Sequence, residues 1–238
     1  MKLSNKIIII ALAVILGGIL YVGASARIMI GKAVKQGDIA FEKADLGERV
    51  KKAYDIDGFR ELSASGIWDI KVSKGDGYQV ILEAEERLIE DTIIDKRGRQ
   101  IYLSMEEDMY VVGRQPIRVE IITPELSSVS LRGGANLTLE DFTSDSFTIE
   151  SEGASNVEGR NNIFKDLMLS CEGAVNIDLK DSKTVNAEVD LEGASNVVLT
   201  MDGGSLTGEI EGVGSLEYYG DVSEEDVHNK GLSNIQRH

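Results

Sequence analysis

The 238-residue chain has a single cysteine, two prolines and only 5% aromatic residues. One cysteine excludes an intramolecular disulfide and a cysteine-based metal site. Few aromatic residues together with 25 glycines suit thin, repetitive β-structure better than the core of a globular enzyme. Basic residues are also scarce, since 25 of them face 41 acidic residues and give a formal net charge of −16. A surface this acidic repels phosphate backbones, so we expect no nucleic-acid partner.

The N-terminus has the composition of a membrane-targeting segment. Lys2 and Lys6 precede residues 7–26, which contain no charged residue. A run of about 20 apolar residues is just long enough to cross roughly 30 Å of hydrocarbon as an uncleaved helical anchor. Alternatively, the small residues Ala-Ser-Ala at 24–26 form a signal-peptide cleavage site, and cleavage near Ala26 would release a secreted or periplasmic protein.

We favour the anchor over the cleaved signal. The run is long for a signal peptide, and residues 27–32 (RIMIGK) do not resemble a freshly exposed mature end. A buried helix of a soluble protein is a third interpretation, but nothing else in the chain is apolar enough to cover it. We therefore expect the membrane as a partner through residues 7–26, with the following chain extracytoplasmic, although Arg27, Lys32 and Lys35 weaken the orientation argument from basic flanks.

The second half of the chain repeats itself around one glycine. The glycines lie 20, 20, 20, 19 and 19 residues apart, at Gly133, Gly153, Gly173, Gly193, Gly212 and Gly231. In the first four copies an asparagine follows three residues later, at Asn136, Asn156, Asn176 and Asn196. A fixed period in this range marks a stacked repeat architecture.

Each repeat alternates apolar and other residues on both sides of its glycine. Apolar residues recur four positions before it, with a gap at Gly208, and four positions after it, as at Val129 and Leu137 in the first copy. This period of two predicts two short strands joined by a glycine turn. Two strands cannot bury a core alone, but stacked copies can, with each strand about 4.8 Å from its equivalent. We predict an all-β fold, a parallel β-helix (β-solenoid) with coils of about 20 residues, and expect it to be right-handed.

The chain is expected to divide into four parts. Residues 1–26 are the anchor or signal peptide, and 27–53 a spacer with helical character. Residues 54–124 form an irregular N-terminal β lobe with candidate strands over 67–73, 79–85, 92–95, 100–105 and 117–123. This lobe is either the first, irregular coils of the solenoid or a β-sandwich packed on its end, and Gly66 is a candidate distant copy of the glycine turn.

Residues 125–238 are the repetitive lobe, which ends in a cap. Glu225, Asn229 and Arg237 stand at formerly apolar positions in the last two copies. An uncapped solenoid end is an open sheet edge that invites pairing between chains. Polar residues at this end are the expected remedy.

The chain resembles the head GIN domain family, the auto-transporter adhesin head domain of bacterial envelope proteins, from Phe59 to Asn234. The matching residues are the repeated Glu-Gly-Ala-x-Asn turns, where the family commonly has Ser-Gly-Ala-Gly-Asp/Asn, and Ser65-Gly66, Asp69-Ile70, Gly75-Asp76, Glu83-Ala84-Glu85 and Pro124-Glu125-Leu126. The resemblance implies a two-part β-helical fold, an exported or membrane-anchored location in the bacterial cell envelope and an adhesin-like role. It brings no catalytic residue.

Two rows of stacked side chains are the candidates for a site. The asparagine row is interpreted as a structural ladder of side-chain hydrogen bonds. The second row contains Glu152, Glu172, Glu192 and Glu211, with Arg132 and Lys230 at the same position in the first and last copies. Like charges about 5 Å apart destabilise one another by around 1 kcal/mol per hydrated pair. These carboxylates either splay into water, pair with neighbouring cations or hold a divalent cation such as Ca²⁺.

No catalytic residue and no cofactor is predicted. His228 and His238 are the only histidines, and neither has a suitable Ser or Cys context. Cys171 stands where other copies have leucine and is expected to be buried, whereas Tyr218-Tyr219 is the aromatic pair of most interest. We expect a non-enzymatic, adhesin-like binding domain whose partner is an envelope glycan or protein. The alternatives are a carbohydrate-active enzyme on a β-helix and a scaffold that self-associates through its terminal coils.

Overall fold

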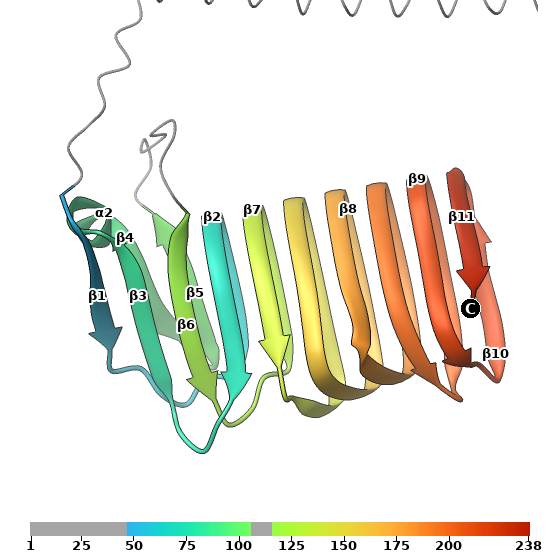
Figure 1. Cartoon of the computed structure of the whole chain (residues 1–238), viewed down its shortest axis with the longest axis horizontal. Helices are drawn as coiled ribbons and strands as arrows, with labels where there is room; N and C mark the ends of the chain where they lie inside the picture. The colour runs from blue at the N-terminus through green and yellow to red at the C-terminus, as the bar shows by residue number, and fades with distance from the viewer. Residues whose placement is uncertain (1–46, 106–115) are drawn as a thin grey trace, which may run out of the picture. The chain divides into compact units, whose positions relative to one another are not determined.

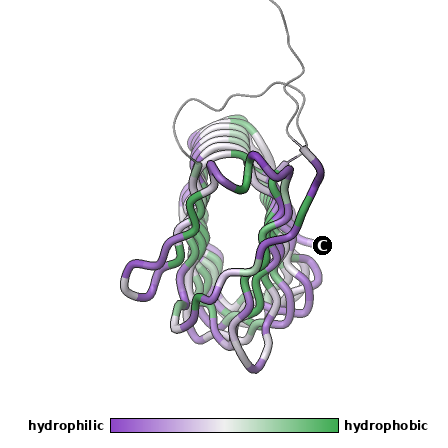
Figure 2. Tube along the Cα trace, turned by 90° about the vertical axis from the view of Figure 1, so that its left-hand side faces the viewer, coloured by the Kyte–Doolittle hydropathy of each residue, from purple (hydrophilic) through white to green (hydrophobic). Residues whose placement is uncertain are grey.

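Eleven strands form a single sheet in the computed structural model, which describes residues 47–105 and 116–238. The strands bend so that the sheet curls around one core (Figures 1 and 2). The expected all-β class is confirmed for these residues. Residues 7–26 and most of the expected spacer lie outside the described residues. Within the described ranges, no helix has both the length and the apolarity to span a membrane.

The N-terminal part contains six strands and one short helix. These are β1 (Arg49–Tyr54), β2 (Glu61–Lys74), β3 (Gln79–Glu85), α2 (Glu86–Glu90), β4 (Thr92–Arg97), β5 (Gln100–Met105) and β6 (Ile117–Thr123). β3, β5 and β6 have the predicted bounds, while β2 and β4 are longer than predicted. β1 overlaps the last residues of the expected spacer and pairs antiparallel with β3. α2 was not predicted; it buries Leu88 and Ile89, which a five-residue segment cannot reveal as a periodic pattern.

The repeats form the remaining strands, β7 (Ser128–Glu140), β8 (Thr143–Asp202), β9 (Ser205–Asp221), β10 (Glu224–Asn229) and β11 (Leu232–Arg237). Successive copies pair in parallel with equivalent residues side by side. Gly133 faces Gly153 in the pairing of β7 with β8, and Gly193 faces Gly212 in the pairing of β8 with β9. The same register places Gly66 of β2 beside Gly133. β2 is therefore the first complete copy of the repeat.

The strands run through the glycine rather than ending there, and they bend at it. Gly133 and Gly153 have φ angles of 103° and 123°, which residues with a Cβ rarely adopt. A Cβ on Gly133 would also lie 2.7 Å from the carbonyl oxygen of Gly66. We call the residues before the bend the first wall, to which β4, β5 and β10 belong. The residues after it are the second wall, with β1, β3, β6 and β11 (Figure 1).

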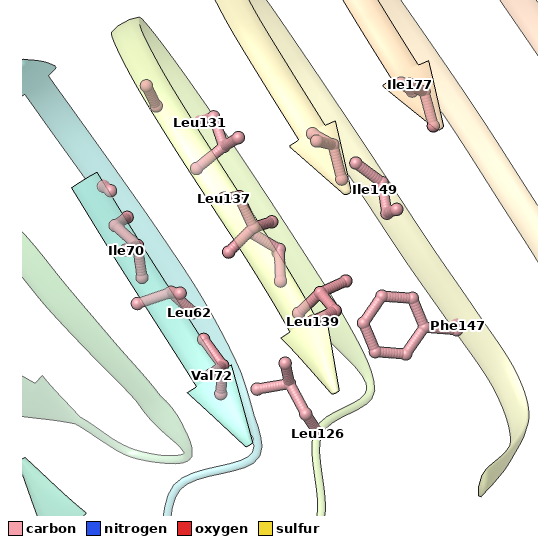
Figure 3. Close-up of a cluster of buried hydrophobic side chains, with 14 of the residues drawn as sticks. Leu62, Ile70, Val72, Leu126, Leu131, Leu137, Leu139, Phe147, Ile149 and Ile177 are labelled. Carbon is pink, nitrogen blue, oxygen red and sulfur yellow. The ribbon is translucent and has the colours of Figure 1, made fainter. Parts of the chain in front are cut away.

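The core lies between the two walls. Alternate residues point inward on both walls, as in the burial pattern of β6, where every second residue is buried. Leu131 and Leu137 of one copy and Ile149 and Ile177 of the following copies are buried in the same core (Figure 3). Phe147 and Phe164 stack with their ring centroids 4.7 Å apart. The apolar ladder thus continues from copy to copy, which is how repeats too small to fold alone gain a common core.

A buried asparagine closes the corner where the second wall ends. Asn162 is 1% exposed; its Oδ1 accepts from the amide of Phe142 at 3.0 Å, and its Nδ2 donates to the carbonyl of Leu139 at 3.0 Å. Nδ2 also lies 2.9 Å from the Ser182 hydroxyl oxygen one copy later. Backbone groups that turn away from the sheet at this corner are satisfied by a side chain instead.

Candidate functional site on the walls of the repeat array

The asparagine row lies on the outside of the second wall, three residues after the bend. Asn176 donates from Nδ2 to Oδ1 of Asn156 at 2.7 Å. Ser215 replaces asparagine in the fifth copy, and its hydroxyl lies 3.2 Å from Oδ1 of Asn196. These side-chain amides form hydrogen bonds with the equivalent residue of the next copy, which suits a structural ladder.

The glutamate row lies on the outside of the first wall, one residue before the bend. Glu192 faces Glu211, as Arg132 faces Glu152. The Nε of Arg132 is 3.4 Å from Oε2 of Glu152, and the Nζ of Lys230 is 3.3 Å from Oε1 of Glu211. The two end members of the row therefore have cationic partners.

The middle of the glutamate row faces water. Glu172 and Glu192 are exposed, and in the described ranges no cation forms an ion pair with either carboxylate. The described residues also contain no group of three or more His, Cys, Asp or Glu side chains arranged to hold a metal ion. Evenly spaced, outward-pointing carboxylates do not converge on one point, which a metal ion or a general acid–base pair requires.

Lys230 connects two rows of acids at the C-terminal end of the first wall. Its ammonium group pairs with Glu209 as well as with Glu211. The hydrogen bond from Lys230, supported by Glu211, lowers the pKa of the Glu209 carboxyl from its usual value of 4.5, and the two carboxylates raise the pKa of Lys230. This basic side chain therefore offsets carboxylate repulsion where the array ends.

The negative charge of the chain is concentrated in the later copies. Residues 143–238 contain 19 acidic and six basic residues, a net charge of −13 out of −16 for the whole chain. Because repeated strands place equivalent side chains above one another, this excess forms acidic outer walls rather than a local cluster. Walls of this charge repel anionic molecules.

The tyrosine pair near the C-terminus divides between the inside and the outside. Tyr218 is buried, and its hydroxyl donates to Oε2 of Glu225 at 2.5 Å. Burial and the Glu225 carboxylate raise the pKa of Tyr218. Tyr219 points outward, where its ring stacks on His238 at 4.7 Å and lies 4.3 Å from the Nζ of Lys180.

The histidines and the cysteine lie apart from one another. His228 Nδ1 is 3.6 Å from Asp226, and His238 Nε2 is 3.2 Å from Glu217, all on outer faces. Cys171 is buried in the core, and burial raises the pKa of its thiol to about 12. A buried, protonated thiol is a poor nucleophile, so Cys171 has a packing role.

Comparison with known families identifies the group to which the chain belongs. A family model described as "Putative auto-transporter adhesin, head GIN domain" matches residues 58–180. The chain belongs to this family. The resemblance noted from the Glu-Gly-Ala-x-Asn turns is thereby confirmed, and the head GIN match covers both the irregular strands and the first repeats.

Solved structures share the fold of this head GIN protein at low sequence identity. A "putative adhesin" from Bacteroides fragilis matches with a TM-score of 0.64 and 17% identity, over 80% of this chain and 97% of its own. A "putative lipid binding protein" from Parabacteroides distasonis matches with a TM-score of 0.52 and 12% identity, over 79% and 97%. No curated protein sequence matches the chain. At these identities the likeness extends to the fold alone.

Proposed function

We propose that this chain is a non-enzymatic, adhesin-like binding domain of the bacterial cell envelope, held at the membrane by residues 7–26 with its β domain extracytoplasmic. The observation that carries the proposal is that the chain belongs to the head GIN family, whose description names an adhesin. An uncharged run of 20 residues at the N-terminus supports the membrane location. The partner class is an envelope glycan or protein.

The architecture proposed for the domain is a right-handed parallel β-helix of about 20-residue coils. It is supported by the parallel register, in which each copy faces the next after 20 or 19 residues, and by strands that bend around one core (Figure 2). Such a rod suits adhesion, because stacked repeats display the same outer positions over a long surface.

Support for binding over carbohydrate turnover comes from the outer walls. A glycosidase needs two carboxyl groups that converge on one bond, beside a platform for the sugar. The outward acids of the first wall are instead repeated at the spacing of the strands, and Tyr219 uses its ring in contacts with Lys180 and His238. The family description adds an adhesin role and no reaction.

The proposal is tested by locating the full chain in a bacterial cell. We expect the protein to stay with the membrane after an alkaline wash, to keep the intact mass of the uncleaved chain and to be digested when protease is added outside the inner membrane. A chain shortened after Ala26 would support the secreted or periplasmic alternative. Protection from protease in spheroplasts but not in lysed cells would contradict the extracytoplasmic location.

A further inference from the structure

The C-terminal end of the array exposes two strand edges. β10 on the first wall and β11 on the second wall each pair in parallel with β9, and no other strand of the described ranges continues the sheet beyond them (Figure 1). Leu232 of β11 is 84% exposed, and its neighbour Val213 is 59% exposed. The polar residues expected to cap this end leave both edges unpaired in the described ranges, and unpaired edges of this kind are templates for another strand.

The two edges are complementary in sequence about Gly231. Residues at equal distances before and after this glycine are opposite in charge, both polar or both apolar, except that Lys230 lies opposite Leu232. The other pairs are Glu224 with His238, Glu225 with Arg237, Asp226 with Gln236, Val227 with Ile235, His228 with Asn234 and Asn229 with Ser233. No pair opposes like charges. The two members of a pair also lie on the same side of the sheet. Glu225 is in register with buried Leu206 and Arg237 with buried Tyr218, so both lie on the core side.

A two-fold axis through the end of the array brings these pairs together. Let the axis run along the strands, between the walls and past Gly231. Rotation about it sets a second copy end to end with the first and places β10 of each copy opposite β11 of the other. The chain runs toward the bend in β10 and away from it in β11, so the facing strands are antiparallel and equal distances from Gly231 meet. Antiparallel partners point to the same face.

We infer that the C-terminal end binds a second copy of this chain, forming a two-fold end-to-end dimer in which β10 and β11 pair reciprocally. Each interface contains two Val227–Ile235 contacts and, on the core side, two Glu225–Arg237 ion pairs. Within its own copy Glu225 also accepts from the Tyr218 hydroxyl, and Arg237 lies 2.6 Å from Asp221. Lys230 keeps its ammonium group on Glu209 and Glu211 of its own copy, and only its aliphatic stem covers Leu232 of the other copy. Because the chain advances along the array as it winds, β11 projects farther beyond the end than β10. The two-fold rotation compensates for this, since it pairs the projecting β11 of each copy with the recessed β10 of the other.

The opposite end of the array is a poorer partner for the same edges. Following the strand registers across the sheet, a head-to-tail stack would set Lys52 of β1 over Ile235 and Tyr54 over Arg237, both on the core side. Lys52 would then face an apolar side chain without a carboxylate partner, which is costly. The two-fold arrangement places Glu225 and Arg237 opposite each other. Because both copies use the same surface, the assembly stops at two copies.

This inference does not depend on the proposed function, because it concerns only the last coil. We expect the full chain in mild detergent to sediment as a monomer–dimer equilibrium. Glu225→Arg and Arg237→Glu should each weaken the dimer roughly tenfold or more, a loss of about 1.4 kcal/mol or greater. The double variant E225R/R237E should recover most of the lost affinity, since each interface regains both ion pairs, although each copy loses its own Tyr218–Glu225 and Arg237–Asp221 contacts. Glu172→Arg, an exposed acid on the first wall far from the end, is the matched control and should leave the equilibrium unchanged.

Cysteine pairs provide a test that does not rely on charge. His228 and Asn234 are exposed on opposite outer faces of one copy, so a bond within one chain is impossible, whereas in the dimer they face each other. His228→Cys with Asn234→Cys should oxidise to a disulfide-linked dimer, and Asp226→Cys with Asn234→Cys, two residues out of register, should not. Cys171 is buried and does not compete.

Three results would overturn the inference. The first is a wild-type chain that remains monomeric at every concentration reached. The second is a charge-swapped double variant that associates as weakly as the two single variants. The third is equal cross-linking of the in-register and out-of-register cysteine pairs. Association through residues 7–26 would not respond to any of these substitutions, so it is distinguished from the dimer by the same experiments.

Discussion

Asn176 donates a hydrogen bond from its side-chain amide to Oδ1 of Asn156, 20 residues earlier in the chain and 2.7 Å away. The bond runs along the array, perpendicular to the strands, and so ties one copy to the next outside the backbone ladder. A side chain that bonds to its own equivalent fixes the register, because a slip by one residue would turn it to the core.

Replacing Asn176 by alanine should lower the free energy of unfolding by about 1 kcal/mol, the net value of one hydrogen bond. Asn136 occupies the same position in the first copy but forms no side-chain hydrogen bond with the described residues. Asn136→Ala is therefore the matched control and should change stability less. Urea denaturation of the two variants makes the comparison, and equal losses would show that the amide ladder contributes nothing specific.

The bend glycines should tolerate no side chain. Gly133→Ala would force alanine into a φ of 103° and place its Cβ 2.7 Å from the carbonyl oxygen of Gly66. We expect a loss of about 3 kcal/mol or more in unfolding free energy. Gly77 has an ordinary φ, and a Cβ added to it would meet no atom within 4 Å, so Gly77→Ala should be nearly neutral. Similar stabilities for the two variants would contradict the bend geometry.

The corner asparagine should matter more than any residue of the exposed rows. Asn162→Ala would leave the amide of Phe142 and the carbonyl of Leu139 without their buried partner. We expect a loss of about 2–4 kcal/mol, since each unsatisfied buried group costs about 1–3 kcal/mol. Thermal unfolding measures it. A loss as small as that of Asn176→Ala would mean that water replaces the side chain at this corner.

The acidic end of the first wall should depend on Lys230. Because Lys230 lowers the pKa of Glu209 in the folded protein, this pair stabilises the fold above the unfolded carboxyl pKa. That stability is lost as the pH falls through the lower folded pKa. In Lys230→Gln the carboxyl should titrate closer to 4.5, as followed by NMR of the Glu side chains. An unchanged titration of Glu209 would show that the pair does not form in solution.

Cys171 should react with thiol reagents only after unfolding. Burial raises the pKa of its thiol to about 12 from about 9, so the folded protein retains the proton. The associated stability is complete below about pH 9 and is lost as the pH rises toward about 12. We expect slow labelling at about pH 8 and rapid labelling in denaturant, with Cys171→Ala as the blank. Rapid labelling of the folded chain would contradict the burial.

The parallel register of equivalent glycines could be expected from the sequence because each copy contains its own signal. The glycine period, the alternation around Val129 and Leu137 and even the distant copy at Gly66 are local patterns. The way in which β2 is continued was not predictable. Its residues Glu61–Ala64 pair with β5 and its residues Trp68–Lys74 with β6, and such non-local pairing leaves no trace in either strand.

The positions of the outer rows could be predicted from the sequence, whereas the buried corner at Asn162 could not. The register of the glutamate row follows directly from the period, and so do its cationic ends at Arg132 and Lys230. The role of Asn162 could not be predicted, because a lone polar residue in a strand is usually exposed and only the stacking of the Phe142 corner over it makes it buried. The separation of Tyr218 from Tyr219 follows simply from alternation, once the inward positions of β9 are known.

Binding of an envelope component without its transformation is the property that separates the proposed adhesin-like domain from an enzyme. The most direct measurement immobilises the full chain in mild detergent and passes defined envelope glycans over it, while mass spectrometry follows each glycan in the effluent. We predict saturable retention of at least one glycan class, recovered with its mass unchanged. Release of shortened or modified glycan would contradict the proposed function and favour the carbohydrate-active enzyme.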